Sequence, residues 1–324
     1  MQSGRYVFGE TAAHMKFSIF QDSRVGARSY NQDRIGHWYT RDSLLLVLAD
    51  GMGGHLMGEV AAQIAVDTLA ASFQAEAKTR LPDPDLFLYR SIGRIHAAIE
   101  DHTEKLNLPD SPRTTLVACV VQDGHAWWTH IGDSRLYLIR NGRVVVRTRD
   151  HTRVQQLVDQ GRIREESISA HPERNLLLQC LGGPSGPRVE PTASSRLARD
   201  DVLLLCSDGF WGPITQRQLL GTLVEKPIAQ AIPELMTLAE TRAGPQCDNV
   251  SVVSISWSED EVRPSAHEPT DVPVTVPSHD LPTDLQDFNA TDPDFSRTNM
   301  SDEDIERAIS DIKVALKRYN HGKK

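Results

Sequence analysis

The chain has 324 residues, of which 39% are hydrophobic, and its formal net charge is −9. This length suffices for one large domain with extensions or for two ordinary domains. The acidic balance argues against nucleic acid as the main partner, because phosphate backbones bind basic surfaces. No apolar run approaches the roughly 20 residues of a membrane span, and no secretory signal is visible at the N-terminus. The four cysteines form no CxxC pair, which fits a reducing, cytoplasmic compartment.

Short apolar runs bounded by turn residues indicate strands, and longer stretches with helical spacing indicate helices. Residues 1–14 show neither pattern and are expected to be flexible. Strands are predicted over 15–20, 35–39, 44–49, 114–121, 125–131, 136–139, 144–147, 202–206 and 250–257. Helices are predicted over 59–73, 85–105, 152–160, 215–225 and 229–242. Strand pairs with helix pairs between them favour an α+β layered sandwich over an alternating parallel-sheet fold.

The composition changes after Trp257. Residues 259–300 are rich in Pro, Thr, Ser and Asp and have almost no apolar periodicity, which predicts a disordered linker. Residues 301–320 then form the pattern of an amphipathic C-terminal helix, with an apolar stripe of Ile305, Ile309, Ile312 and Leu316. A helix this short is marginal in water alone. We therefore expect it to dock on the chain's own domain, on a partner or on a second copy.

Four aspartates stand beside the ends of predicted strands. Three of them follow an apolar run and the fourth precedes one; they are Asp50, Asp133, Asp208 and Asp248. At such a position the sheet fixes the backbone while the side chain can project into a cleft. A single aspartate there could simply form an Asx-turn. Four of them, from distant parts of one chain, predict a site that binds hard divalent cations through oxygen ligands.

An arginine and a fifth aspartate add to this set near the start of the chain, where Arg28 precedes Asp33 by five residues. The planar guanidinium of arginine can hold two phosphate oxygens; a surface ion pair is the alternative interpretation. With the four strand-end aspartates, the combination predicts phosphoryl hydrolysis. In such sites two divalent cations lower the pKa of a bridging water to give hydroxide, and an arginine orients the phosphate.

Six short motifs resemble those of a known family. In chain order they are Arg28…Gln32-Asp33, Asp50-Gly51-Met52-Gly53-Gly54-His55, Thr114-Thr115-Leu116, Gly132-Asp133-Ser134-Arg135, Ser207-Asp208-Gly209 and Asp248-Asn249. Their order and spacing resemble the type 2C (PPM) metal-dependent serine/threonine protein phosphatases, particularly the bacterial members. Residues 15–258 are therefore interpreted as the catalytic domain. The resemblance implies a four-layer αββα sandwich of two antiparallel sheets flanked by helices.

The resemblance also implies a set of ligands for Mn²⁺ or Mg²⁺. Asp50 would bridge two tightly bound ions, and the carbonyl of Gly51 would be a further oxygen ligand. Asp208 and Asp248 would complete the first metal site. Asp133, together with Asp208, would hold a third and weaker ion.

The remaining roles concern the substrate and the departures from the family pattern. Arg28 would bind the substrate phosphate, and Asp33 would hold metal-bound water or bind a metal directly. Gln32 stands where many relatives have Glu, which implies a weaker second site. Met52 stands where eukaryotic relatives carry a His proposed as general acid, so another group must protonate the leaving oxygen. Arg113 replaces the usual small residue before Thr114.

Three histidines and a tryptophan near these motifs allow two interpretations each. His151 and His171 are interpreted as hydrogen-bonded loop residues, with metal ligation as the alternative. His55 is interpreted as a residue that orients the metal-binding loop. Trp211 is interpreted as a core residue, with contact to a phosphoserine substrate as the alternative.

The family resemblance implies a serine/threonine protein phosphatase that hydrolyses phosphoserine and phosphothreonine on proteins. Its partners would be phosphorylated proteins and a cognate Ser/Thr kinase. Two alternatives remain open: a catalytically inactive scaffold with the same fold, and a hydrolase of small phosphate esters. The presence of Asp50, Asp208 and Asp248 argues against the inactive scaffold.

Overall fold

A computed structural model describes residues 5–10, 15–52, 57–184, 186–258 and 274–276. The chain divides into two units, Met1–Ser278 and His279–Lys324, and every described residue belongs to the first. The predicted helix over 301–320 and most of the predicted linker lie outside the described residues, as does His55. Within the described ranges, every helix is too short or too polar to span a membrane.

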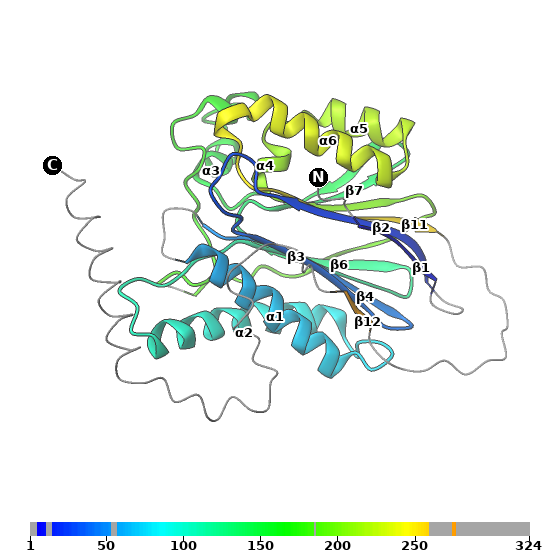
Figure 1. Ribbon diagram of the computed structural model, residues 1–324, viewed down its shortest axis with the longest axis horizontal. Coiled ribbons are helices and arrows are strands. Elements are labelled where there is room, and N and C mark those ends of the chain that lie inside the picture. The colour runs from blue at the N-terminus through cyan, green and yellow to red at the C-terminus, as the bar shows by residue number, and fades with distance from the viewer. Residues whose placement is uncertain (1–4, 11–14, 53–56, 185, 259–273, 277–324) are drawn as a thin grey trace. The chain divides into compact units, whose positions relative to one another are not determined.

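Two six-stranded sheets form the centre of the described unit (Figure 1). All pairs of neighbouring strands are antiparallel. The first sheet has the order β1 (Arg5–Glu10), β2 (Lys16–Arg24), β11 (Val250–Ser258), β10 (Val202–Cys206), β7 (Arg135–Arg140) and β8 (Arg143–Arg147). The second has the order β12 (Val274–Val276), β3 (Asp33–Tyr39), β4 (Ser43–Asp50), β5 (Leu116–Gln122), β6 (His125–Ile131) and β9 (Ala193–Arg196).

Strand β4 shows why the sheets stack. Side chains alternate between the two faces of a strand, and here both faces are apolar. Leu44, Leu46 and Leu48 pack into the layer between the two sheets. Leu45 and Val47 pack on the other side, against helices α1 (Gly58–Glu76) and α2 (Pro84–Lys105). A strand that is apolar on both faces must lie in an inner layer.

Helices cover the outer faces of both sheets (Figure 1). Helices α1 and α2 pack on the second sheet, while the first is covered by α4 (Asp208–Trp211), α5 (Gln216–Glu225) and α6 (Ile228–Ala243). The sequence starts two of them with standard caps: Asp83 accepts from the backbone of Leu86 before α2, and Thr215 forms a capping box with Gln218 at α5. The shorter helices are α3 (Arg153–Asp159), η1 (Glu165–Ala170) and η2 (Gly244–Gln246). The predicted αββα sandwich is confirmed.

Three short strands lie where the sequence indicates no regular structure. Strand β1 falls within residues 1–14, β9 within the irregular stretch before residue 200, and β12 within the predicted linker. Each pairs with a single neighbour at the edge of a sheet. An edge strand is held mainly by backbone hydrogen bonds on one side, so its side chains need no apolar alternation. The pattern used to find strands is therefore absent or weak in such segments.

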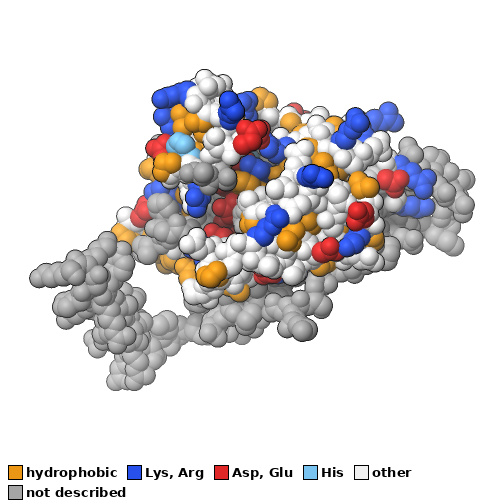
Figure 2. Space-filling model, turned by 90° about the horizontal axis from the view of Figure 1, so that it is seen from above, with side chains coloured by type: hydrophobic (Ala, Val, Ile, Leu, Met, Phe, Trp, Pro, Cys, Tyr) orange, Lys and Arg blue, Asp and Glu red, His pale blue; other side chains and the backbone are white. Residues whose placement is uncertain are grey.

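The surface on the side of α5 and α6 carries both signs of charge. Figure 2 shows Lys and Arg side chains interspersed with Asp and Glu over this face. Several of the arginines described there and elsewhere are paired with carboxylates, such as Arg24 with Glu240 at 2.9 Å. This mixture agrees with a net charge of −9 and does not provide the basic surface that a nucleic acid would require.

An ion pair between the half-exposed Arg140 and the buried Asp201 connects β7 to the turn before β10 and gives a test of the fold. The side chain of Asp201 is fully buried and accepts from Nε and Nη2 of Arg140 at 2.8 and 2.7 Å, and from the backbone of Ala198 at 2.8 Å. We expect Asp201→Asn to lower the free energy of unfolding by about 1–2 kcal/mol, because it weakens the hydrogen bonds that the buried side chain accepts while solvent still reaches Arg140. The exposed neighbour Asp200, whose side chain is 83% exposed, is the control: Asp200→Asn should change it by less than about 0.5 kcal/mol. Urea denaturation of both variants makes the comparison.

Candidate active site

The sheets bring together five carboxylates that the sequence predicts as site residues. Asp33 and Asp50 are directly opposite one another at the start of β3 and the end of β4. Asp208 lies two residues after β10, and Asp248 lies two residues before β11. Asp133 lies in the turn between β6 and β7. The charge of Asp50 interacts with those of the other four, so carboxylates from both sheets meet in one place.

Burial and mutual repulsion make these carboxylates hard to ionise. Burial, followed by the charges of Asp33 and Asp208, raises the pKa of Asp50 well above its ordinary value. Burial and the charge of Asp133 do the same to the pKa of Asp208. Burial is also the main cause that raises the pKa of Asp33 to about 6 and that of Asp133 to about 7. The protein thus concentrates negative charge that cations would neutralise.

The backbone of Asp50 is fixed by the motif Thr114-Thr115. The Thr115 hydroxyl accepts from the Asp50 amide at 3.0 Å. The Asp50 carbonyl accepts from the Thr114 hydroxyl at 2.9 Å and from the Thr115 amide at 2.8 Å. The Thr115 hydroxyl also lies 2.8 Å from the hydroxyl of Ser134, beside Asp133. Two threonines at the start of β5 therefore hold Asp50 in place and link it to the Asp133 turn.

Asp33 lies beneath the site and is held through Ser207. The Ser207 hydroxyl donates to Oδ2 of Asp33 at 2.8 Å and accepts from the Ser251 amide at 3.0 Å. Oδ1 of Asp33 is buried and has no hydrogen-bond partner among the residues described. A buried oxygen left without a partner is costly, and a cation or a water held by one would satisfy it.

Asn249 joins the segment around Arg28 to the Asp248 turn. Its side-chain oxygen accepts from the Gln32 amide at 2.8 Å. Its side-chain nitrogen donates to the carbonyls of Val25 and Tyr30 at 2.9 and 3.1 Å. The sequence motifs alone give Ser207 and Asn249 no role. The feature that points to them is a strong hydrogen-bonding side chain directly next to a predicted metal ligand.

Two glycines allow the loops to approach this closely. A Cβ on Gly51 would lie 2.4 Å from the carbonyl oxygen of Gly58 at the start of α1. A Cβ on Gly209 would lie 2.1 Å from the carbonyl oxygen of Asn249. Both contacts are with backbone atoms, which cannot move aside independently. The pairs Asp50-Gly51 and Asp208-Gly209 thus mark places where the chain at a predicted metal ligand packs directly against another backbone segment.

Arg28 lies at the exposed side of the site. Its Nη2 forms an ion pair with Oδ2 of Asp248 at 2.6 Å, and its side chain is 55% exposed. An exposed guanidinium next to the carboxylates is placed to meet a phosphate from solvent. Nearby, Gln32 donates to Oε2 of Glu59 at 3.1 Å. The neutral residue that departs from the family pattern therefore lies next to a carboxylate from α1.

The histidines and Arg113 make structural contacts. His151 is buried, and its Nδ1 accepts from the Gly132 amide at 3.2 Å while its own amide donates to the Gly132 carbonyl at 2.9 Å. Mainly because of burial, the pKa of His151 falls to about 4, so it stays neutral and braces the Asp133 turn. His171 accepts from the Glu173 amide at 3.1 Å. The Arg113 carbonyl accepts from the Met52 amide at 2.9 Å, a backbone contact that any residue could make.

The donor set fits divalent metal ions. Hard cations prefer carboxylate and carbonyl oxygens, and this site has five carboxylates together with an unpartnered oxygen of Asp33. Within the described part of the chain, no three acidic, histidine or cysteine side chains are arranged closely enough to hold a metal ion as they stand. The Asp248 carboxylate instead binds Arg28. A cation would therefore have to replace this partner.

Comparisons with known proteins agree with this site. The family model described as "Protein phosphatase 2C" matches residues 21–230. The serine/threonine protein phosphatase PstP of Mycobacterium tuberculosis is 40% identical over 212 residues, which cover 64% of this chain and 39% of PstP. A putative protein phosphatase 2C-type of Streptococcus pyogenes is 32% identical over 77% of this chain and 100% of its own length. The chain belongs to the protein phosphatase 2C family.

Solved structures show the same fold. The M. tuberculosis PstP/Ppp structure has a TM-score of 0.65 at 34% identity and covers 75% of this chain and 99% of its own. A catalytic domain of PstP in complex with two manganese ions has a TM-score of 0.64 at 32% identity, covering 75% of this chain and 99% of its own. The family is metal-dependent. This chain nevertheless spans only about two fifths of the full length of PstP.

The raised pKa values predict how the metal-free protein responds to pH. A carboxyl with a raised pKa keeps its proton in the folded state where the unfolded chain has lost it, so stability falls as pH rises. For Asp33 and Asp133 this fall begins near their ordinary value of 3.8 and ends at about 6 and about 7. We expect Asp133→Asn to remove part of the decrease in the free energy of unfolding between pH 4 and pH 7. Urea denaturation in EDTA measures this free energy at each pH. An identical pH dependence in the variant would contradict the raised pKa of Asp133.

The ion pair of Arg28 predicts an effect on metal binding. Arg28 would compete with a cation for Asp248, so Arg28→Ala should bind Mn²⁺ about two- to fivefold more tightly, as loss of a partly exposed ion pair allows. The same variant should have a higher KM for a phosphopeptide. Arg80 is the control, since it pairs with Asp123 at 2.8 Å on the surface; Arg80→Ala should change neither value. Calorimetric titration showing weaker Mn²⁺ binding by Arg28→Ala would contradict the competition.

Proposed function

We propose that this chain is a metal-dependent serine/threonine protein phosphatase that hydrolyses phosphoserine and phosphothreonine on proteins. The observation that carries the proposal is the meeting of five buried or half-buried carboxylates with the exposed guanidinium of Arg28. Family membership and the names of the relatives support it. We place the reaction in the cytoplasm, in keeping with the free cysteines of the chain.

The proposed cations are Mn²⁺ or Mg²⁺. Asp50, the Gly51 carbonyl, Asp208 and Asp248 would hold two of them, and Asp133 with Asp208 would hold a third, weaker ion. When bound, such ions supply a nucleophilic water of lowered pKa and offset the charge of the phosphate. The manganese-bound structure of a PstP catalytic domain supports the cation class.

The chain's own residues orient the reactants. Arg28 would hold two oxygens of the phosphate through its planar fork once it has left Asp248. Asp33, supported by Ser207, would accept a hydrogen bond from water at the metal ligands or bind a metal directly. Fixed carboxylates and a fixed guanidinium lower the barrier chiefly because they need no reorganisation as charge develops.

The proposed substrates are phosphorylated proteins, and the opposing enzyme would be a Ser/Thr kinase. The partial exposure of Arg28 supports a large substrate, because a phosphate on a protein surface can reach the guanidinium without entering a deep pocket. The chain retains Asp50, Asp208 and Asp248, which disfavours an inactive scaffold.

Phosphate release measures this proposal directly. With Mn²⁺ the chain should hydrolyse a phosphothreonine peptide, and Asp208→Asn and Asp248→Asn should each lose at least 100-fold in kcat/KM because the cations lose a ligand. Asp200→Asn, at an exposed position, should keep full activity. Turnover of p-nitrophenyl phosphate without turnover of the peptide would instead favour the small-ester hydrolase. Activity on neither substrate would favour the inactive scaffold.

A further inference from the structure

Trp211 connects two of the proposed metal ligands. It is the last residue of the one-turn helix α4, whose first residue is Asp208. Its indole Nε1 donates a hydrogen bond of 2.9 Å to the backbone carbonyl of Asp133. One end of α4 thus presents a carboxylate to the site, and the other end holds the backbone of a second carboxylate that comes from a different part of the chain.

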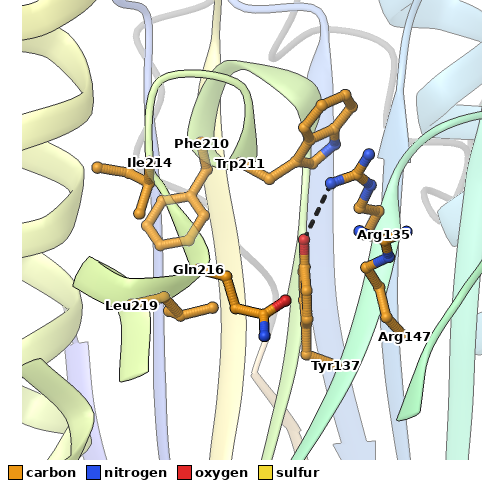
Figure 3. A pocket seen from close by; sticks show the side chains of 8 residues that line it. All are labelled: Arg135, Tyr137, Arg147, Phe210, Trp211, Ile214, Gln216 and Leu219. Carbon is orange, nitrogen blue, oxygen red and sulfur yellow. Dashed lines mark hydrogen bonds between the residues drawn. The ribbon is translucent and has the colours of Figure 1, made fainter. Parts of the chain in front are cut away.

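Arg135 fixes the orientation of the Trp211 ring. Its guanidinium carbon lies 3.4 Å from the ring centroid, a cation–π contact. The buried guanidinium donates to both oxygens of Asp150, from Nε at 2.8 Å and from Nη2 at 2.7 Å, and from Nη1 to the Tyr137 hydroxyl at 3.1 Å. Figure 3 shows the Arg135 guanidinium beside the indole and above Tyr137. Because Arg135 has four fixed contacts, it is a rigid support for the ring.

A cavity next to α4 makes this support necessary. Its volume is about 90 Å³, and it is lined by Arg135, Tyr137, Arg147, Phe210, Trp211, Ile214, Gln216 and Leu219 (Figure 3). Protein interiors are normally close-packed, and close packing is what fixes the orientation of a short helix. Here the apolar contacts of α4 are interrupted by open space. Phe210 anchors α4 in the core, whereas the Trp211 ring borders the cavity and is held by its hydrogen bond to Asp133 and by the stacked guanidinium.

We propose that Trp211 is a positioning residue that sets the separation of Asp208 and Asp133, and thereby the affinity for the third, weaker cation. This inference rests on the proposed function, which assigns these two aspartates to that ion. Trp211 acts on the ligands and not on the substrate. The interpretation of Trp211 as a core residue is thus extended. The ring packs beside the core, and its N–H group holds the backbone of Asp133.

The physical consequence of losing the N–H is local. The Asp133 carbonyl would lose its partner, and the Asp133 turn could move relative to Asp208. Asp208 itself would stay in place, because Gly209 packs tightly against the backbone of Asn249. The tight sites, which would use Asp208 but not Asp133, should therefore change much less than the weak site.

Calorimetric titration of the full chain with Mn²⁺ tests the proposal without measuring activity. Trp211→Phe keeps an aromatic ring and removes the donor; we expect the weakest binding step to weaken about fivefold, which corresponds to one hydrogen bond of about 1 kcal/mol. The tighter steps should stay within twofold. Trp38→Phe is the matched control, because Nε1 of Trp38 is buried without a hydrogen-bond partner in the described chain. It should leave all binding steps unchanged.

The outcomes separate this proposal from the assignment of the ligands. The role of Trp211 is overturned if Asp133→Asn weakens the weakest Mn²⁺-binding step while Trp211→Phe binds at that step with the same affinity as the unmodified chain. If Asp133→Asn also leaves that step unchanged, the ligand assignment and the inference that rests on it both fail. Should Trp211→Phe not fold, the isosteric 3-benzothienylalanine at position 211 keeps the bicyclic ring and removes only the N–H; an unchanged weak step there would equally overturn the proposal.

Discussion

The repulsion among buried carboxylates is the constraint on which the rest of this structure depends. Asp33, Asp50, Asp133 and Asp208 all have raised pKa values, and burial is the first cause in each case. Charges removed from water and brought close to like charges cost several kcal/mol. A fold that keeps them together is therefore less stable without cations, but it provides a high local concentration of oxygen ligands. Bound cations would offset this loss of stability.

The sandwich keeps the carboxylates in place through neutral hydrogen-bonding residues. Asp50 is held by two threonines, and Asp33 is held through the hydroxyl of Ser207. Asn249 connects the Arg28 segment with the Asp248 turn. In each case a neutral hydrogen-bonding residue supports a charged one. Neutral supports add no charge to a site that already has an excess, and the two threonines bind only the backbone of Asp50, which leaves its side chain available to a ligand.

Much of the fold and of the site can be predicted from the sequence. Strands β6 and β10 are bounded by turn residues, and both have the bounds that the sequence predicts. The edge strands β1, β9 and β12 could not be predicted, since backbone pairing holds them without an apolar pattern. The aspartates proposed as metal ligands are recognisable in the sequence as carboxylates at strand ends. The role of Trp211 is not visible, because its partner is a backbone carbonyl 78 positions away.

The free energy of unfolding of Asp208→Asn, measured by urea denaturation at pH 7.5 both in EDTA and in excess Mn²⁺, tests the central claim most directly. In EDTA the variant should be more stable than the unmodified chain by about 1–3 kcal/mol, because one of the repelling carboxylates is gone. In Mn²⁺ the order should reverse, since only the unmodified chain gains the full binding energy of the ions. A variant that is less stable than the unmodified chain in EDTA would contradict the account, because Asp208 would then stabilise the metal-free fold.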